Sequence, residues 1–371
     1  MKSYDIVVIG GGPAGLSAAL TAASTGVKVL IVDDGMQLGG QLVKQTHKFF
    51  GSAEQFAGIR GIDIAQNFIH EINGSSNIEV LNDSIVTGYY EDGIVTIVKG
   101  SNGDKLIKVK PRIVIVATGA LENMLPLVNN DLPGVYGAGA VQTLMNVYGI
   151  IPGREVLMVG AGNIGLIVAY QLMQAGIHVQ AIVEAMPHIG GYWVHASKIR
   201  RFGVPIYTSC TIKEIIGKNE VEKAKICKID NNFNFIAGTE KELMVDTVCL
   251  AVGLSPLTEL LWQAGCQMRY VPELCGYVAL QDENMKTSLD HIYIAGDVSG
   301  IEEASSAMIE GKIAGLNAAA SLGCKSESFQ RFNLELKEQL DQLRANSMSI
   351  SIKKGIEKAT IRKGEDYVYK N

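Results

Sequence analysis

The sequence is poor in the features that mark several large classes of protein. Its 371 residues contain six cysteines, all in the second half of the chain, and no two of them form a CxxC pair. So few, scattered thiols in a chain of this length do not form a disulfide framework, and no His, Cys or carboxylate spacing is typical of a metal site. We therefore expect reduced cysteines, no metal and a cytoplasmic protein.

Other absences narrow the range of partners. The formal net charge is -5 and aromatic residues make up 6%, so the chain lacks the basic field and the stacking surface of a nucleic-acid-binding protein. No run reaches the roughly 20 apolar residues of a transmembrane helix, and glycines interrupt the apolar run after Asp5, unlike a signal peptide. Hydrophobic residues at 47% and charged residues at 19% are typical of a compact globular protein, here long enough for two domains.

A strand, a glycine-rich turn and a helix follow one another twice along the chain. Continuous apolar strands between amphipathic helices are typical of a parallel sheet that is covered on both faces. The fold class is therefore α/β with two Rossmann-like domains. The predicted segments are strands at 5–9, 27–32, 113–116, 155–159 and 177–183, helices at 14–25 and 165–175, and a helical pattern at 329–343.

The first turn reads Gly10-x-Gly12-x-x-Gly15. The first glycine permits a tight turn, the second lets the backbone approach a pyrophosphate, and the third lets the helix pack against the strand. The helix N-terminus then presents N–H groups to the phosphates. Asp33 lies about 18 residues after Gly15, where a carboxylate can accept both hydroxyls of a ribose. The motif predicts dinucleotide binding; the alternative is a glycine-rich turn without a ligand.

The second turn, Gly160-x-Gly162-x-x-Gly165, is followed by Glu184 at the matching strand end. A carboxylate there favours a free 2′-hydroxyl and repels a 2′-phosphate, so NAD is expected rather than NADP. The alternative is a second Rossmann unit that has become a scaffold and lost its ligand.

A third motif, Gly296-Asp297, follows the apolar strand predicted at 291–295 and precedes a helix predicted at 301–322. An Asp at a strand end can bind a ribityl hydroxyl, and a helix that begins near Ala304 can direct N–H groups at a flavin ring. Because this motif lies far downstream of the first glycine turn, the two together predict that the first dinucleotide is FAD.

The order of these motifs resembles the two-dinucleotide-binding-domain flavoproteins, the pyridine-nucleotide oxidoreductases related to thioredoxin reductase. The resemblance covers roughly residues 4–323. It implies an FAD domain at 1–120 and 254–324, an inserted NAD domain at 121–253, and a C-terminal extension at 325–371. It implies FAD contacts at Gly10, Gly12, Pro13, Ala14, Gly15, Asp33, Gly40, Gln41, Ala117, Thr118, Gly119, Gly296, Asp297 and Ala304. It implies NAD contacts at Gly160, Gly162, Asn163, Ile164, Gly165 and Glu184.

The chain departs from that family at the redox disulfide. Family members that reduce disulfides carry a CxxC either soon after the first acid or just before the second glycine turn. The corresponding stretches here, 39–43 and 141–149, contain no cysteine. A thiol relay of electrons is therefore excluded.

A narrower resemblance lies between residues 117 and 165, in the runs ATGA-x-E, LPGV and N-x-YG. These are similar to the FAD/NAD-type subunits of heteromeric amine and amino-acid dehydrogenases, such as sarcosine oxidase, opine oxidase, hydrogen-cyanide synthase and dye-linked proline dehydrogenases. The resemblance implies an oligomer with a partner dehydrogenase subunit. Many such chains continue into a cysteine-rich iron–sulfur domain. Only Cys324 follows Cys275 here, so that domain is not expected in this chain; a separate iron–sulfur subunit could supply it, or the electrons could take another route.

The segment after Gly39-Gly40-Gln41 runs beside the flavin in this fold and offers His47 as a catalytic candidate. An imidazole there could assist proton transfer or stabilise a negatively charged reduced flavin; the alternative is a polar surface residue. Two other functions stay open: a stand-alone NADH:acceptor reductase, and a nucleotide-binding scaffold that docks a partner through 325–371. We expect the polar stretch 350–371 to be a solvated extension.

Overall fold

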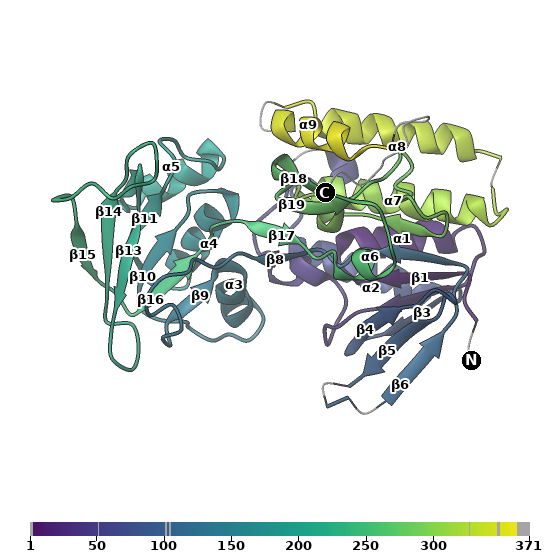
Figure 1. The fold of residues 1–371 in the computed structure, drawn as a ribbon, viewed down its shortest axis with the longest axis horizontal. Helices are drawn as coiled ribbons and strands as arrows, with labels where there is room; N and C mark the ends of the chain where they lie inside the picture. Colours follow the sequence, from purple (N-terminus) through teal and green to yellow (C-terminus); the bar gives the residue numbers. More distant parts are fainter. Residues whose placement is uncertain are drawn as a thin grey trace. The chain divides into compact units, whose positions relative to one another are not determined.

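The computed structural model describes residues 3–50, 52–100, 102–103, 105–325, 327–346 and 349–361 (Figure 1). The chain forms two compact units. The first comprises Met1–Val43, Lys48–Leu121 and Ser255–Asn371, and the second comprises Lys44–His47 and Glu122–Leu254. Each unit contains a five-stranded parallel sheet, which confirms the predicted α/β class.

The sheet of the first unit has the strand order β20-β7-β1-β2-β3, with every pair parallel. Successive residues of β1 point to opposite faces. Ile6 and Val8 belong to the core beneath the helices, whereas Val7 and Ile9 face the three-stranded antiparallel sheet β4-β5-β6. The sheet strands are β1 (Ile6–Ile9), β2 (Val29–Val32), β3 (Ile78–Leu81), β7 (Ile113–Val116) and β20 (Ile292–Ile294). The antiparallel strands are β4 (Ser84–Tyr89), β5 (Val95–Lys99) and β6 (Lys105–Val109).

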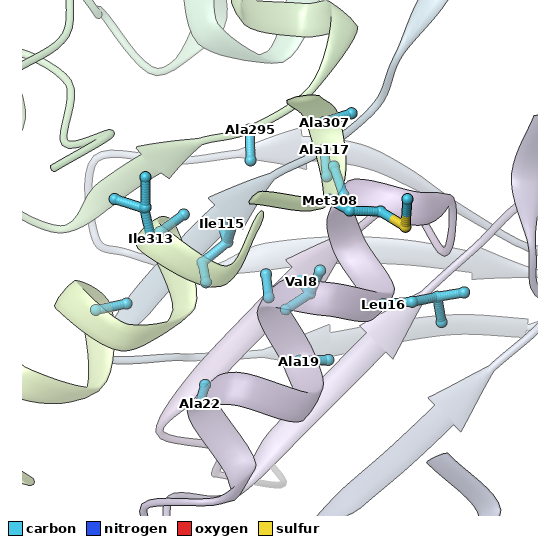
Figure 2. Close-up of a cluster of buried hydrophobic side chains, with 14 of the residues drawn as sticks. Val8, Leu16, Ala19, Ala22, Ile115, Ala117, Ala295, Ala307, Met308 and Ile313 are labelled. Carbon is cyan, nitrogen blue, oxygen red and sulfur yellow. The ribbon is translucent and has the colours of Figure 1, made fainter. Parts of the chain in front are cut away.

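Three helices cover the other face: α1 (Pro13–Ala23), α2 (Gly61–Gly74) and α7 (Ala304–Ser321). Helices α1 and α7 pack backbone against backbone. A Cβ atom at Gly311 would lie 2.1 Å from the Ala14 carbonyl oxygen, and one at Gly315 would lie 2.2 Å from that of Ala18. Small residues therefore allow this approach, and larger side chains such as Ile313 fill the adjoining core (Figure 2).

The second unit repeats this plan with the strand order β12-β11-β10-β16-β9, again parallel. Val156 and Met158 of β10 face the helices, and Leu157 and Val159 face the antiparallel sheet β13-β14-β15. The parallel strands are β9 (Val135–Gly137), β10 (Glu155–Val159), β11 (His178–Glu184), β12 (Ile206–Thr208) and β16 (Thr247–Leu250). The helices are α3 (Ala138–Asn146), α4 (Asn163–Gln174) and α5 (Trp193–Arg201), and the antiparallel strands are β13 (Cys210–Ile216), β14 (Lys223–Lys228) and β15 (Lys241–Met244).

Short elements complete the chain. Strands β8 (Ala120–Glu122) and β17 (Leu254–Pro256) form a two-stranded sheet where the chain passes from the first unit to the second and back. The return leg continues into α6 (Glu259–Gln263) and the hairpin β18 (Met268–Val271) and β19 (Gly276–Ala279). No helix among the described residues is long and apolar enough to span a membrane.

The C-terminal extension is folded, which corrects the expectation of a solvated stretch after residue 350. Helix α8 (Phe329–Leu343) buries Leu336 and Leu340, and α9 (Ile350–Ala359) packs Ile352 and Ile356 against the β18–β19 hairpin. The Ile361 N–H donates to the Gln281 carbonyl at 2.8 Å. The sequence did not predict α9 because its short apolar stripe at helical spacing lies among lysines. Residues 362–371 lie outside the described residues.

Candidate functional site

The first glycine turn joins β1 to α1 in a form that only glycine allows. Gly10 has φ +105, and a Cβ there would lie 2.2 Å from the Ala117 carbonyl oxygen. A Cβ at Gly15 would lie 1.9 Å from the Gly10 carbonyl oxygen. The first glycine therefore makes the turn, and the third brings α1 against the strand.

The second glycine of this turn borders a backbone cradle. Gly12 is the N-cap of α1 and has no side chain to cap the helix, and Pro13 follows at the first helical position. Gly40 approaches from the other side with φ +51; a Cβ there would lie 2.7 Å from the Gly12 Cα. Ala14 and Gly15 supply the next N–H groups of the first turn, and Gly40 and Gln41 are exposed. This arrangement fits a pyrophosphate, which needs close backbone and unpaired helix N–H groups.

Asp33 closes the cradle at the end of β2. It is buried, and its two carboxylate oxygens accept the N–H groups of Gly11 at 2.5 Å and Gly35 at 2.9 Å. Burial raises the pKa of Asp33, and these two hydrogen bonds oppose the rise. Each carboxylate oxygen has a second lone pair, so the side chain retains capacity to accept a ribose hydroxyl.

The end of β7 leads into the predicted turn Ala117-Thr118-Gly119. The Thr118 hydroxyl donates to the Leu257 carbonyl at 2.7 Å, and the Leu257 N–H donates to the Gly119 carbonyl at 3.0 Å. These bonds tie the two sequence-distant parts of the first unit together directly beside the glycine turn.

Gly296 and Asp297 follow β20, the next strand of the same sheet. Gly296 has φ +80, and Asp297 begins a 3₁₀ turn (Asp297–Ser299) before α7 starts at Ala304. Burial raises the pKa of Asp297 to about 6, although its Oδ1 accepts the Glu302 N–H at 3.4 Å. Because β20, β7, β1 and β2 are parallel neighbours, their carboxyl ends bring the predicted FAD residues that follow these four strands to one sheet edge.

The second glycine turn has the same glycine geometry and the same acid contacts as the first. Gly160 has φ +109, and a Cβ there would lie 2.2 Å from the Ala251 carbonyl oxygen; one at Gly165 would lie 2.1 Å from the Gly160 carbonyl oxygen. Glu184 accepts the N–H groups of Ala161 at 2.7 Å and Met186 at 2.9 Å. The remaining predicted residues lie at the start of α4: Gly162 is its N-cap, and Asn163 and Ile164 are its first residues.

His47 lies in a setting that the sequence did not reveal. The short segment Lys44–His47 belongs to the second unit, where the Asn146 amide donates to the Lys44 carbonyl at 2.7 Å and the Gln171 amide donates to the Thr46 hydroxyl at 2.8 Å. Burial, helped by His195 and Lys198, lowers the pKa of His47 to about 4. An imidazole with such a lowered pKa is neutral near pH 7, which favours the proton-transfer role over stabilisation of a charged reduced flavin, and both roles of His47 stay predictions.

The cysteines do not form a redox pair. All six are free, and four of them are buried. Burial raises the pKa of Cys249, and it raises that of Cys266 to about 11, so neither is a thiolate at neutral pH. Among the described residues, no group of His, Cys, Asp and Glu is arranged to hold a metal ion.

Residues 4–311 match the family model of the pyridine nucleotide-disulphide oxidoreductases. The chain belongs to this family. It is therefore an oxidoreductase, and the cofactors of the family, FAD and NAD(P), are those that its two glycine turns fit.

Individual relatives agree with this family. An opine oxidase subunit of Agrobacterium tumefaciens is 27% identical over 92% of this chain and 70% of its own length. L-Proline dehydrogenase from P. horikoshii has a similar fold, with a TM-score of 0.68, 24% identity and coverage of 92% of this chain and 59% of its own. Thioredoxin reductase from T. acidophilum gives a TM-score of 0.70 at 23% identity, covering 87% of this chain and 99% of its own. The chain thus spans only part of the first two proteins.

Proposed function

We propose that this chain is the FAD- and NAD-binding subunit of a heteromeric amine or amino-acid dehydrogenase. One observation carries the proposal: both dinucleotide turns are geometrically complete in a chain that lacks the redox cysteine pair of disulfide reductases. The similarity to the opine oxidase protein of Agrobacterium tumefaciens, which is itself named as a subunit, supports a place in a larger assembly.

The first unit supplies the FAD residues. The start of α1, with Gly12 and the facing Gly40, would hold the pyrophosphate, and Asp33 would accept ribose hydroxyls. Asp297 would bind a ribityl hydroxyl, and the N-terminus of α7 at Ala304 would supply N–H groups to the flavin. When bound, FAD accepts and releases two electrons; the chain orients it and tunes the charge around it.

The second unit supplies the NAD residues. The start of α4 at Gly162 and Asn163 would hold the pyrophosphate, and Glu184 would accept the 2′-hydroxyl of the adenosine ribose. Its negative charge repels a 2′-phosphate, which selects NAD over NADP. The overall exchange moves two electrons and one proton between NAD(H) and a second redox partner. No thiol of this chain can serve as that partner.

A partner subunit is the proposed second redox partner. It would oxidise an amine or amino acid, and a separate iron–sulfur subunit would carry electrons between that partner and this chain. A stand-alone NADH:acceptor reductase is the second candidate, because the thioredoxin reductase of similar fold is covered over 99% of its length by this chain alone.

Native mass spectrometry of the complex purified from its own cell tests the proposal. We expect FAD, NAD and at least one additional polypeptide in a defined stoichiometry. The purified FAD-loaded chain is then mixed with NADH and a dye. Full turnover by the single chain, without any co-purifying polypeptide, would favour the stand-alone reductase over the heteromeric dehydrogenase.

A further inference from the structure

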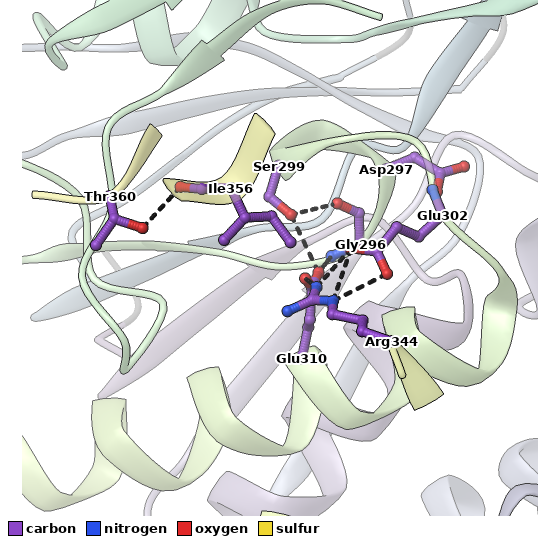
Figure 3. A network of polar contacts seen from close by, with 8 residues as sticks. All are labelled: Gly296, Asp297, Ser299, Glu302, Glu310, Arg344, Ile356 and Thr360. Carbon is purple, nitrogen blue, oxygen red and sulfur yellow. Dashed lines mark hydrogen bonds and ion pairs between the residues drawn. The ribbon is translucent and has the colours of Figure 1, made fainter. Parts of the chain in front are cut away.

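A buried cluster of charges connects the C-terminal extension to the loop after β20. Arg344 is the C-cap of α8. Its Nε donates to both carboxylate oxygens of Glu302, at 3.1 and 3.0 Å, and its Nη2 donates to Glu302 Oε1 and Glu310 Oε1, each at 2.5 Å (Figure 3). One guanidinium from the extension thus holds two carboxylates of the FAD-binding region.

All three side chains are shielded from water. Arg344 and Glu302 are each 8% exposed, and Glu310 is 4% exposed. Charges buried to this degree need a partner in the protein, because water no longer stabilises them. Burial raises the pKa of Glu310, and Arg344 opposes that rise. Arg344 is therefore the group that keeps the two carboxylates together.

Glu310 and Glu302 also make hydrogen bonds to the loop after β20. The second oxygen of Glu310 accepts the Gly296 N–H at 2.8 Å and the Ser299 hydroxyl at 3.0 Å. The Glu302 N–H donates to Asp297 Oδ1 at 3.4 Å. Two hydrogen-bonded routes, one through Glu310 and one through Glu302, therefore lead from Arg344 to the Gly296-Asp297 pair.

We infer that Arg344 is a positioning residue for the FAD site, so that docking of the C-terminal extension and binding of FAD stabilise each other. The inference rests on the proposed placement of FAD at Gly296 and Asp297. Without the guanidinium, Glu302 and Glu310 repel each other and must separate or take up a proton. Either response disturbs the carboxylate oxygen of Glu310 that accepts the Gly296 N–H. Thermodynamic coupling is reciprocal, so FAD must in turn favour the docked extension.

A simpler role for Arg344 is to stabilise the packing of α8 against the first unit without any effect on the cofactor. That role predicts a loss of stability with unchanged FAD affinity in the folded fraction. The positioning role predicts a change in affinity and in the flavin's surroundings, even under conditions where the protein is fully folded.

The test compares Arg344→Met with Arg331→Met in the full-length protein. Arg331 is on the same helix, but its side chain is 79% exposed and it pairs with Glu335 on the surface at 3.4 Å. FAD Kd is measured by fluorescence titration of the folded apoprotein, together with the visible circular dichroism of bound FAD. We expect Arg344→Met to raise Kd about tenfold and to change the spectrum, with Arg331→Met within about twofold of the wild type.

Hydrogen exchange supplies the reciprocal measurement. FAD should slow amide exchange in α8 and α9 of the wild type and of Arg331→Met, but not of Arg344→Met. Arg344→Lys keeps the charge without the forked geometry, so it should fall between the two, and it serves as the test variant where Arg344→Met does not fold.

The outcomes separate the two proposals. Variants at Arg344 that bind FAD as tightly as Arg331→Met, with the same spectrum, overturn the inference alone. A wild-type protein that binds no FAD overturns the proposed function and this inference with it.

Discussion

The two glycine turns of this protein are built to the same plan, down to individual hydrogen bonds. In each, the acid at the end of the next strand accepts the N–H of the residue after the first glycine: Gly11 to Asp33, and Ala161 to Glu184. In each, a later glycine donates back to that residue, Gly39 to the Gly11 carbonyl at 2.8 Å and Gly191 to that of Ala161 at 2.9 Å.

The difference lies at the outer strand of each sheet. In the first unit, β20 is followed by Gly296-Asp297 and by α7, whose N-cap residue makes no side-chain cap. In the second unit, β9 occupies the same place in the strand order, and α3 follows it directly. There Glu122 already accepts the N–H groups of Gly139 at 2.6 Å and Ala140 at 3.3 Å. The two turns share one backbone plan, but the helix after the outer strand has no side-chain cap in the first unit, whereas Glu122 already accepts the N–H groups of that helix in the second.

The largest expected effects come from filling the third glycine of either turn. Gly15→Val and Gly165→Val each place side-chain atoms on a backbone carbonyl, so we expect each to destabilise its unit by more than about 3 kcal/mol. Gly15→Val should abolish FAD retention, whereas Gly165→Val should retain FAD and lose reduction by NADH. Gly74→Ala is the control, because a Cβ there meets nothing within 4 Å. Loss of FAD from Gly165→Val instead would show that the two cradles do not act separately.

Asp297→Asn tests the feature that only the first turn has. A folded-state pKa of about 6, above the ordinary 3.8, means that the stabilisation from a protonated Asp297 is present below about pH 4 and is lost as pH rises to about 6. The neutral Asn should therefore stabilise the apoprotein at pH 7 by about 2 kcal/mol and flatten that pH dependence. FAD Kd should rise about tenfold, because a ribityl acceptor is weakened. Equal stability at pH 7 in both proteins would contradict this interpretation.

Glu184→Arg sharpens the comparison at the nucleotide level. Replacing the acid with a cation removes the repulsion of a 2′-phosphate, so the ratio of kcat/KM for NADPH to that for NADH should rise by about tenfold or more. FAD content should not change, because Asp33, in the other turn, is the acid proposed to bind the ribose of FAD. An unaltered ratio would mean that the second turn does not bind the nicotinamide nucleotide.

The smallest expected effect is at His47. With its pKa lowered to about 4, the side chain does not titrate between about pH 6 and 8, so it contributes no step to the rate of NADH-dependent flavin reduction there. His47→Gln should leave the shape of that pH profile unchanged. A step near pH 6.5 that disappears in the variant would show that the bound state restores an ordinary pKa.

Much of the fold followed from the sequence because its signals are local. The strands at 113–116 and 155–159 and the helix at 329–343 have the predicted bounds. Helix α9 was missed because its apolar residues are few among lysines, and α2, α3 and α5 were not predicted from the sequence pattern. For the candidate sites, glycines and acids at fixed spacings were readable, but Arg344, Glu302 and Glu310 carried no motif.

The sequence by itself determined the two cradles. Each turn requires glycines at positions where φ is positive or where the backbone touches a carbonyl, and this requirement is local. The acid follows the turn after one helix and one strand, so its distance along the sequence is nearly fixed. The order of the motifs also predicted that Gly296 and Asp297 act with the first cradle. Only the tertiary structure decided that Arg344 holds the carboxylates behind them and that Lys44–His47 belongs to the second unit. These contacts join residues far apart along the chain, and they arise from sheet order and helix packing, which no local pattern encodes.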